Sequence, residues 1–186
     1  MVYCKLERDN MNLTENVESR RFVIVESPYA GTTAKEINLN LRYLRLCMND
    51  CIMRGEVPYA SHGLYTQRGV LRDNVPGDRK LGMNCGFAVR ERFDFSAFYT
   101  DLNLSSGMDD GVADGDSKSF PKEYRKLFPE LTDMEAIRAE IIKRTTFPAD
   151  HYPGWDDSVW DVSEPKKPHY CQACNHPNNC EYSTRN

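Results

Sequence analysis

The residues best able to do chemistry stand in three short polar stretches, at residues 27–33, 61–67 and 101–108. They supply hydroxyl and carboxylate groups that can hold a sugar, and an imidazole that can transfer a proton. Each stretch follows an extended, apolar run of the sequence. If those runs are parallel strands, the three stretches meet at one edge of a sheet, where ligands bind in such folds.

The first stretch lies between a predicted strand and a predicted helix. Its backbone N–H groups, hydroxyls and helix start could hold an anionic or sugar-phosphate ligand. It contains neither GxGxxG nor a lysine-bearing phosphate loop, so it is not a standard dinucleotide or triphosphate site. The alternative is an ordinary strand-to-helix turn with threonine caps, and the spacing favours neither interpretation.

The second stretch carries His62, which stands with Tyr65 and Arg79 as a possible constellation. Histidine titrates near pH 6.5 and could protonate a leaving base, while arginine could bind a phosphate or carboxylate. The alternative is a structural histidine that is hydrogen-bonded to a backbone carbonyl. We favour the functional interpretation because three loops are expected to converge on this edge.

The third stretch begins at Asp101, which directly follows a buried strand. Its carboxylate could accept hydrogen bonds from ribose hydroxyls, or the acidic residues near it could hold a divalent cation such as Mg²⁺. For the acidic residues further along we expect a solvated loop instead. These are Asp109, Asp110, Asp114 and Asp116.

Short apolar runs alternate with helical patterns, which predicts an α/β fold of Rossmann-like, three-layer type with a central parallel sheet. Residues 109–118 are expected to be weakly helical at most, and Thr132 is the expected cap of the last helix. The predicted strands are 21–26, 57–61 as an edge or entry strand, 96–102 and 124–128, and the predicted helices are 34–54, 78–92 and 133–144.

The chain has 186 residues and a net charge of −4, which argues against a protein that binds a nucleic-acid duplex through a basic face. Its apolar runs are far shorter than a membrane span, and no signal-peptide core is recognisable. We therefore expect a soluble, cytoplasmic protein. Residues 1–20 form a polar lead-in, 21–144 the globular domain, and 145–186 an extended arm rich in Pro and aromatic residues that packs on the domain or on a neighbour.

Seven cysteines are scattered unevenly, and Cys47 and Cys51 fall in a helical pattern where buried thiols act as small apolar groups. No disulfide framework is implied. Three cysteines and two histidines crowd near the end of the chain, where three thiolates and one imidazole would complete a structural Zn²⁺ site. A tail with free thiols is the alternative. The candidate ligands are Cys171, Cys174, Cys180 and His176 (or His169).

Several motifs together resemble the nucleoside 2-deoxyribosyltransferase-like superfamily. They are Ser-Pro-Tyr-Ala-Gly at 27–31, Asn38 or Asn40 with Arg42-Tyr43, Gly-x-x-Pro at 55–58, and Asp-x-x-x-x-Ser-Gly-Met at 101–108. Residues 57–66, 78–83 and 99–101 more closely resemble small uncharacterised bacteriophage relatives. The resemblance covers roughly residues 21–128.

The resemblance implies a domain that binds a nucleoside or nucleotide, with no organic cofactor, in a homo-oligomer whose neighbours complete each other's pockets. Tyr29 and Asp101 correspond to family site residues, and Asp101 and His62 are the candidate catalytic groups. The nucleophilic Glu of the family would fall at Gly111, which has no side chain to form a covalent intermediate. The candidate ligand-binding residues are Ser27, Pro28, Tyr29, Gly31, Asn38, Arg42, His62, Tyr65, Arg79, Asp101, Ser105, Ser106, Gly107 and Met108.

Two hypotheses follow for the function. The first, favoured by Gly111, is a binder of a nucleoside, nucleotide or nucleotide-derived signal, encoded by a phage to sequester a host signal. The second, kept open by His62 and Asp101, is a transferase or hydrolase acting on the N-glycosidic bond of a nucleoside or nucleotide. A structural or regulatory subunit with a vestigial pocket is a third interpretation.

Overall fold

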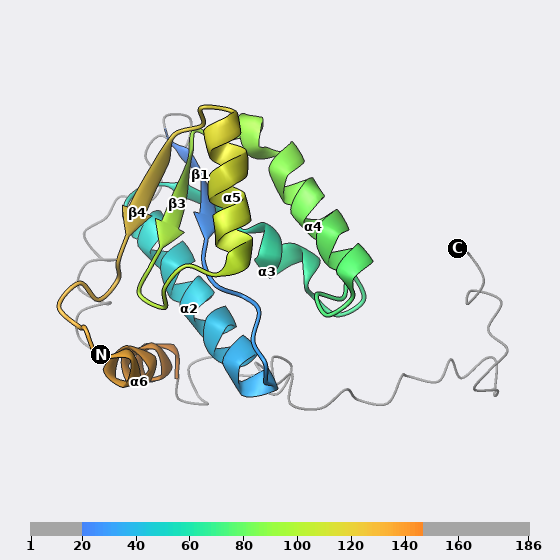
Figure 1. Ribbon diagram of the computed structural model, residues 1–186. Helices are drawn as coiled ribbons and strands as arrows, with labels where there is room; N and C mark the ends of the chain where they lie inside the picture. The colour runs from blue at the N-terminus through green and yellow to red at the C-terminus, as the bar shows by residue number, and fades with distance from the viewer. Residues whose placement is uncertain (1–19, 147–186) are drawn as a thin grey trace, which may run out of the picture.

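The structure is a computed structural model, and it describes residues 20–146 (Figure 1). Four parallel strands form one sheet in the order β2-β1-β3-β4. Helices cover both faces, so the predicted three-layer, Rossmann-like α/β fold is confirmed. The strands are β1 (Phe22–Glu26), β2 (Val57–Tyr59), β3 (Phe95–Tyr99) and β4 (Lys122–Arg125), and the helices are α2 (Ala34–Met53), α3 (Ser61–Tyr65), α4 (Pro76–Ala88), η2 (Arg90–Arg92), α5 (Ser106–Ser117) and α6 (Met134–Thr145).

The two central strands are buried because apolar residues point to both faces of the sheet. Val23, Ile24 and Val25 of β1 are almost fully buried, and every residue of β3 is buried. Such runs without polar alternation are typical of parallel strands that are covered by helices on both faces.

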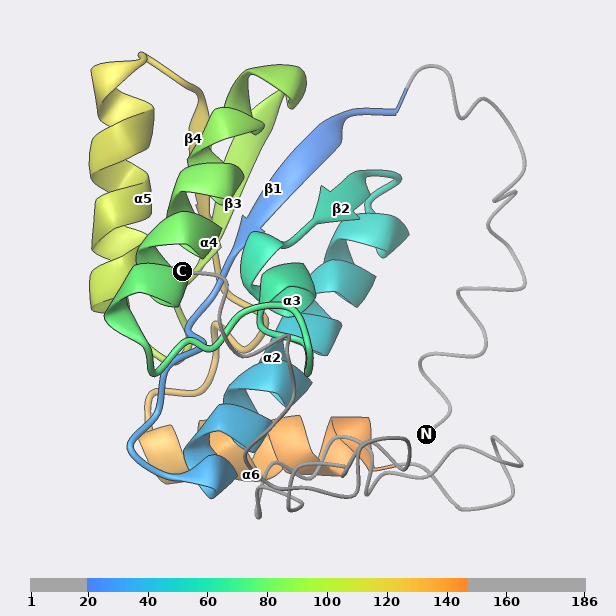
Figure 2. The same cartoon turned by 90° about the vertical axis from the view of Figure 1, so that its right-hand side faces the viewer.

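One face of the sheet is covered by α2, on which α6 packs in turn, and the other by α4 and α5 (Figure 2). Tyr43, Leu44, Cys47 and Cys51 form a helical stripe on α2 that enters the main hydrophobic core. The expected burial of Cys47 and Cys51 is therefore confirmed.

The boundaries predicted from the sequence differ from the structure in several places. The expected helix 78–92 ends at Ala88 and is followed by the short helix η2, and the last strand is Lys122–Arg125 rather than 124–128. Residues 61–65 form the short helix α3 instead of a loop. The cap of α6 is Asp133, which accepts a hydrogen bond from the backbone N–H of Ala136 at 2.7 Å, and not Thr132.

The largest error concerns residues 109–118. The sequence predicts at most a weakly helical segment there, whereas residues 109–117 belong to the regular helix α5 and Lys118 caps it. Its glycines and aspartates have poor helix propensity. Met108, Gly111 and Gly115 are nevertheless buried on one side of α5. Tertiary packing against the sheet therefore stabilises a helix that local preference does not favour.

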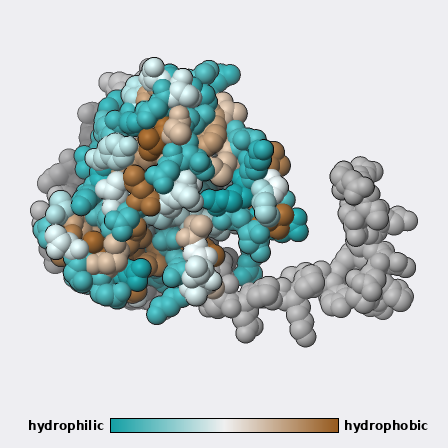
Figure 3. Space-filling view, viewed as in Figure 1, coloured by the Kyte–Doolittle hydropathy of each residue, from teal (hydrophilic) through white to brown (hydrophobic). Residues whose placement is uncertain are grey.

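Within residues 20–146, no helix combines the length and apolar character needed to cross a membrane. The face shown in Figure 3 is mostly hydrophilic, with hydrophobic residues in small separate groups. Almost all of the predicted polar lead-in and almost all of the C-terminal arm fall outside the described residues.

Candidate functional site

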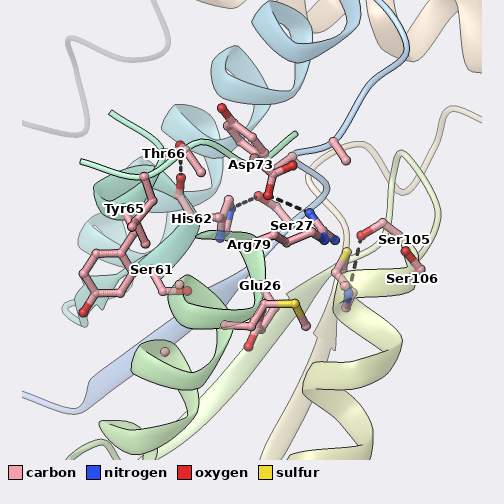
Figure 4. A pocket seen from close by; sticks show the side chains of 18 of the residues that line it. Glu26, Ser27, Ser61, His62, Tyr65, Thr66, Asp73, Arg79, Ser105 and Ser106 are labelled. Atoms are coloured by element: carbon pink, nitrogen blue, oxygen red, sulfur yellow. Dashed lines mark hydrogen bonds and ion pairs between the residues drawn. The ribbon is translucent and has the colours of Figure 1, made fainter. Parts of the chain in front are cut away.

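A pocket opens at the carboxyl end of β1, enclosed by the loop that follows β1, by α3, by α4 and by the start of α5 (Figure 4). Chain segments far apart in the sequence therefore meet at one edge of the sheet, as expected for parallel strands. Of the predicted ligand-binding residues, those that line the pocket are Ser27, Tyr29, His62, Tyr65, Arg79, Ser105, Ser106, Gly107 and Met108.

Ser27 and His62 form a hydrogen-bonded pair at the centre of the pocket, with 3.0 Å between Ser27 Oγ and His62 Nε2. Burial lowers the pKa of His62 to about 4. The imidazole is therefore neutral at pH 7, and it lacks the extra proton that the expected transfer to a leaving base requires. The ring of Tyr29 lies edge-on to that of His62, at 6.4 Å between centroids.

Arg79 lines the pocket close to the first turn of α5 (Figure 4). A Cβ atom built on Gly107 would be 3.1 Å from Arg79 Nη2, so the guanidinium closely approaches the start of this helix. Arg79 Nη1 pairs with Asp73 at 2.6 Å. The N–H groups of a first helical turn have no partner within the helix, so cation and helix start together favour an anion here.

The start of α2 is occupied differently, because Glu36 folds back onto it. Its Oε2 accepts hydrogen bonds from the backbone N–H of Thr32 at 2.6 Å and of Thr33 at 3.2 Å, while Thr33 Oγ1 accepts one from the N–H of Glu36. This is a complete capping box. Of the two interpretations of this loop, the structure supports the capped turn, since an internal carboxylate already fills the place of an anion.

Asp101, the predicted catalytic carboxylate, does not line the pocket. Its oxygens accept hydrogen bonds from the Tyr43 hydroxyl at 2.6 Å and from the backbone N–H groups of Leu127 at 2.9 Å and Phe128 at 2.8 Å. The residue is only 4% exposed. Asp101 therefore joins α2 to the segment after β4 on the other side of the sheet.

Four further predicted ligand residues also lie outside the pocket lining, namely Pro28, Gly31, Asn38 and Arg42. Asn38 Oδ1 accepts a hydrogen bond from Arg42 Nε at 2.9 Å, and Arg42 also donates to the backbone oxygen of Thr145 at 3.2 Å. The first bond lies within α2, and the second ties α2 to α6. The neighbouring Asn40 instead holds the first loop, because its side chain donates to the backbone oxygen of Tyr29 at 3.0 Å.

Glu26, the last residue of β1, lines the pocket and was not predicted. Its side chain is 15% exposed. Burial, opposed in part by Arg90, raises its pKa to about 7. Two sequence signals point to this residue. A glutamate ends an otherwise apolar strand, and it falls on the strand face opposite Val23 and Val25.

Helix α5 approaches this carboxylate through glycines spaced four residues apart. A Cβ built on Gly111 would be 3.2 Å from Glu26 Oε1, and one built on Gly115 would be 3.3 Å from Arg90 Nη1. Together with Gly107 beside Arg79, these glycines leave room for a row of charged side chains between α5 and its neighbours. These side chains are Arg79, Glu26 and Arg90, and Arg90 is almost completely buried, at 1% exposed.

Asp109, Asp110 and Asp116 are exposed, as the solvated interpretation predicts, whereas Asp114 pairs with Arg90. No group of three or more His, Cys, Asp or Glu side chains within residues 20–146 is arranged to hold a metal ion. The predicted zinc ligands Cys171, Cys174, Cys180 and His176 (or His169) lie outside the described residues.

The fold and pocket define the class of the protein, a Rossmann-like α/β domain with a pocket at the carboxyl edge of its sheet. A family model described as a domain of unknown function (DUF7768) matches residues 21–125. This is more than half of the chain, so the protein belongs to that family. The match begins at β1 and ends with β4, and so contains the whole sheet and pocket. Comparisons with curated proteins and with solved structures found no match.

Proposed function

We propose that this domain binds a nucleoside or nucleotide in the pocket at the end of β1. The observation that carries the proposal is the division of the pocket into two chemically different ends. Tyr29, His62 and Tyr65 supply aromatic surface at one end, and Arg79 with the start of α5 supplies positive potential at the other. A heterocycle joined through a sugar to a phosphate has the same division.

The aromatic end suits a base because its polar atoms are held in place. Tyr65 Oη accepts a hydrogen bond from the Tyr59 hydroxyl at 3.0 Å, and His62 is fixed by Ser27. A neutral imidazole and two phenol rings offer apolar surface together with hydrogen-bond donors and acceptors, which is how such pockets orient a ligand.

The cationic end suits a phosphate more than a neutral group. Arg79 keeps Nη2 directed at the first turn of α5 while Nη1 pairs with Asp73. Ser105 and Ser106 add hydroxyl groups at the same place. A phosphate there would receive charge-assisted hydrogen bonds from the guanidinium as well as bonds from the helix start.

The second candidate function, chemistry at the N-glycosidic bond, requires a carboxyl group at the ligand. Asp101 faces away from the pocket, but Glu26 lines it. Binding without turnover would suit sequestration of a nucleotide signal, while turnover would make the domain a hydrolase or transferase.

Binding can be tested by calorimetric titration of deoxynucleosides and their 5′-monophosphates into the pure protein. We expect Arg79→Ala to weaken monophosphate binding about tenfold or more, as loss of a charge-assisted bond implies, with a smaller effect on the nucleosides. Arg138→Ala, on α6, is the matched control and should leave affinity unchanged. Equal loss for both ligand classes would show that Arg79 does not hold a phosphate.

A further inference from the structure

Three carboxyl groups line the pocket, and two of them are held in short ion pairs. Asp73 pairs with Arg79 at 2.6 Å, and Asp78 pairs at 2.8 Å with an arginine of the loop before α4. Hydrogen bonds from that arginine keep the pKa of Asp78 below its usual range. Glu26 has no ion pair as short, because the nearest nitrogen of Arg90 is 3.5 Å from its Oε1. The charge of Glu26 is therefore the least compensated of the three.

Arg90 compensates Glu26 only in part because it is committed to other groups. Its Nη1 donates to Ser96 Oγ at 2.8 Å, and its Nη2 donates to the backbone oxygen of Gly111 at 3.1 Å. Its Nε lies within ion-pair distance of Asp114 Oδ2, at 2.8 Å. Asp114 also adds negative charge near Glu26. An ionised Glu26 therefore leaves negative potential on the wall of the pocket.

Glu26 lies about one helical turn along α5 from the cationic end of the pocket. A Cβ atom built on Gly107 would be 3.1 Å from Arg79 Nη2, and one built on Gly111 would be 3.2 Å from Glu26 Oε1. Cβ positions four residues apart on a helix are separated by about 6 Å. A phosphate held by Arg79 and the start of α5 would therefore lie near the Glu26 carboxyl, in a partly buried site where salt screens charges weakly.

We propose that Glu26 makes the pocket select its ligand by charge: a phosphorylated nucleoside binds the form in which this carboxyl is protonated, whereas an uncharged nucleoside binds both forms. This inference rests on the proposed binding function and adds a pH-dependent choice between ligands to it. Figure 4 shows Glu26 below Ser27, His62 and Arg79 in that view, on the wall of the same pocket.

Glu26 can change its charge near neutral pH. Burial raises its pKa, Arg90 lowers it in part and Asp114 raises it further, which leaves a value of about 7. The carboxyl is therefore mostly protonated at pH 6 and mostly ionised at pH 8.5. A phosphate nearby favours the protonated form, and by linkage the protonated form favours the phosphate.

The other groups that face Glu26 do not change their charge in this range. From η2 and α5 they are Arg90 and Asp114, which form an ion pair with each other. From α3 the group is His62, which burial keeps neutral down to about pH 4 by lowering its pKa. From α4 it is Arg79, whose guanidinium stays protonated. The strands β2 and β3 on either side of β1 carry no charged residue.

The test is calorimetric titration of a deoxynucleoside and its 5′-monophosphate into the unmodified protein and into Glu26→Gln, at pH 6 and pH 8.5. The quantity compared is the dissociation constant of the unmodified protein divided by that of the variant, because this ratio cancels the ionisation of the ligand itself. For the monophosphate the ratio should rise about fivefold or more between the two pH values, as expected if the phosphate raises the pKa of Glu26 by one unit or more. For the nucleoside it should change less than about twofold.

Glu130→Gln is the matched control, because it removes an exposed carboxyl outside the pocket lining. Its ratio should be the same at both pH values for both ligands. A pH-dependent ratio for this variant equal to that of Glu26→Gln would overturn the inference, since the effect would then not come from the pocket.

The remaining outcomes separate the inference from the function on which it rests. Monophosphate binding with a ratio that does not change with pH, or an equal change for both ligands, overturns the role of Glu26 and leaves the binding function intact. Absence of binding by either ligand at both pH values overturns both. If Glu26→Gln does not fold, titration of the unmodified protein at pH 7.5 in buffers of different ionisation enthalpy decides. Proton uptake with the monophosphate supports the inference, and no uptake contradicts it.

Discussion

Gly111 of α5 leaves room for the carboxyl group of Glu26 of β1, because a Cβ atom built on Gly111 would lie 3.2 Å from Glu26 Oε1. The carboxylate of a β1 residue therefore lies directly against this position of α5. The contact explains why α5 has a buried glycine at a site where other residues would form a better helix.

We predict that Gly111→Ala stabilises the protein less than replacing a helical glycine by alanine normally does. Alanine stabilises a helix interior by up to about 1 kcal/mol over glycine, but here its methyl group would displace the Glu26 carboxyl. Gly77→Ala on α4 is the control, because a Cβ there meets nothing within 4 Å. In urea unfolding, Gly111→Ala should be less stable than Gly77→Ala by at least about 1 kcal/mol. Equal stability of the two variants would show that Glu26 moves aside without cost.

The raised pKa of Glu26 predicts a stability that falls as pH rises. The unfolded chain releases this proton near pH 4.5, whereas the folded protein keeps it until about pH 7. The free energy of unfolding therefore decreases as the pH rises between these values, by up to roughly 3 kcal/mol. Glu26→Gln removes this dependence, so the stability of the variant relative to the unmodified protein should increase from pH 4.5 to 7 and then level off. Urea unfolding at several pH values measures it, and a constant difference would contradict the raised pKa.

His62 predicts the opposite slope over an overlapping range. The unfolded chain takes up a proton below about pH 6.5, and the folded protein resists it until about pH 4. Stability is therefore lost as pH falls from 6.5 towards 4. In the unmodified protein this loss offsets the Glu26 effect between pH 4.5 and 6.5. His62→Gln separates the two effects. In thermal unfolding, the stability of this variant relative to the unmodified protein should increase as the pH falls from 6.5 to 4.5. If the stability of His62→Gln relative to the unmodified protein decreased instead as the pH falls, His62 would be readily protonated in the folded protein.

The sheet could be predicted from the sequence, because its apolar β-branched runs and the helix between them follow simple periodicity. The meeting of Tyr29 and His62 in one pocket also follows from parallel strands. The direction in which side chains point beyond the strand ends is harder to predict from the sequence. Phe95, Ala97 and Tyr99 face α2, and Asp101 continues that alternation towards α2 and away from the pocket.

Glu26 and α5 show why the remainder of the site was missed. Helix propensity underestimates the stability of α5, which is rich in glycine and aspartate. That stability comes from tertiary packing, which cannot be read from local sequence. The spacing of Gly107, Gly111 and Gly115 was the available signal. Glycines four residues apart on a helix mark a face that another group approaches closely, and here these groups are charged side chains.

Asp101 allows a final prediction, since its contacts assign it to stability rather than to the ligand. Asn at this position retains one acceptor oxygen and directs N–H groups at the remaining donors. Asp101→Asn should therefore cost about 2–4 kcal/mol in urea unfolding. Tyr43→Phe removes only the phenol bond and should cost about 1–2 kcal/mol. Calorimetric titration of the folded Asp101→Asn variant should give the affinity of the unmodified protein for the same nucleotides. A folded variant with normal stability and weakened binding would place Asp101 at the ligand after all, and would move the site to the α2 side of the sheet.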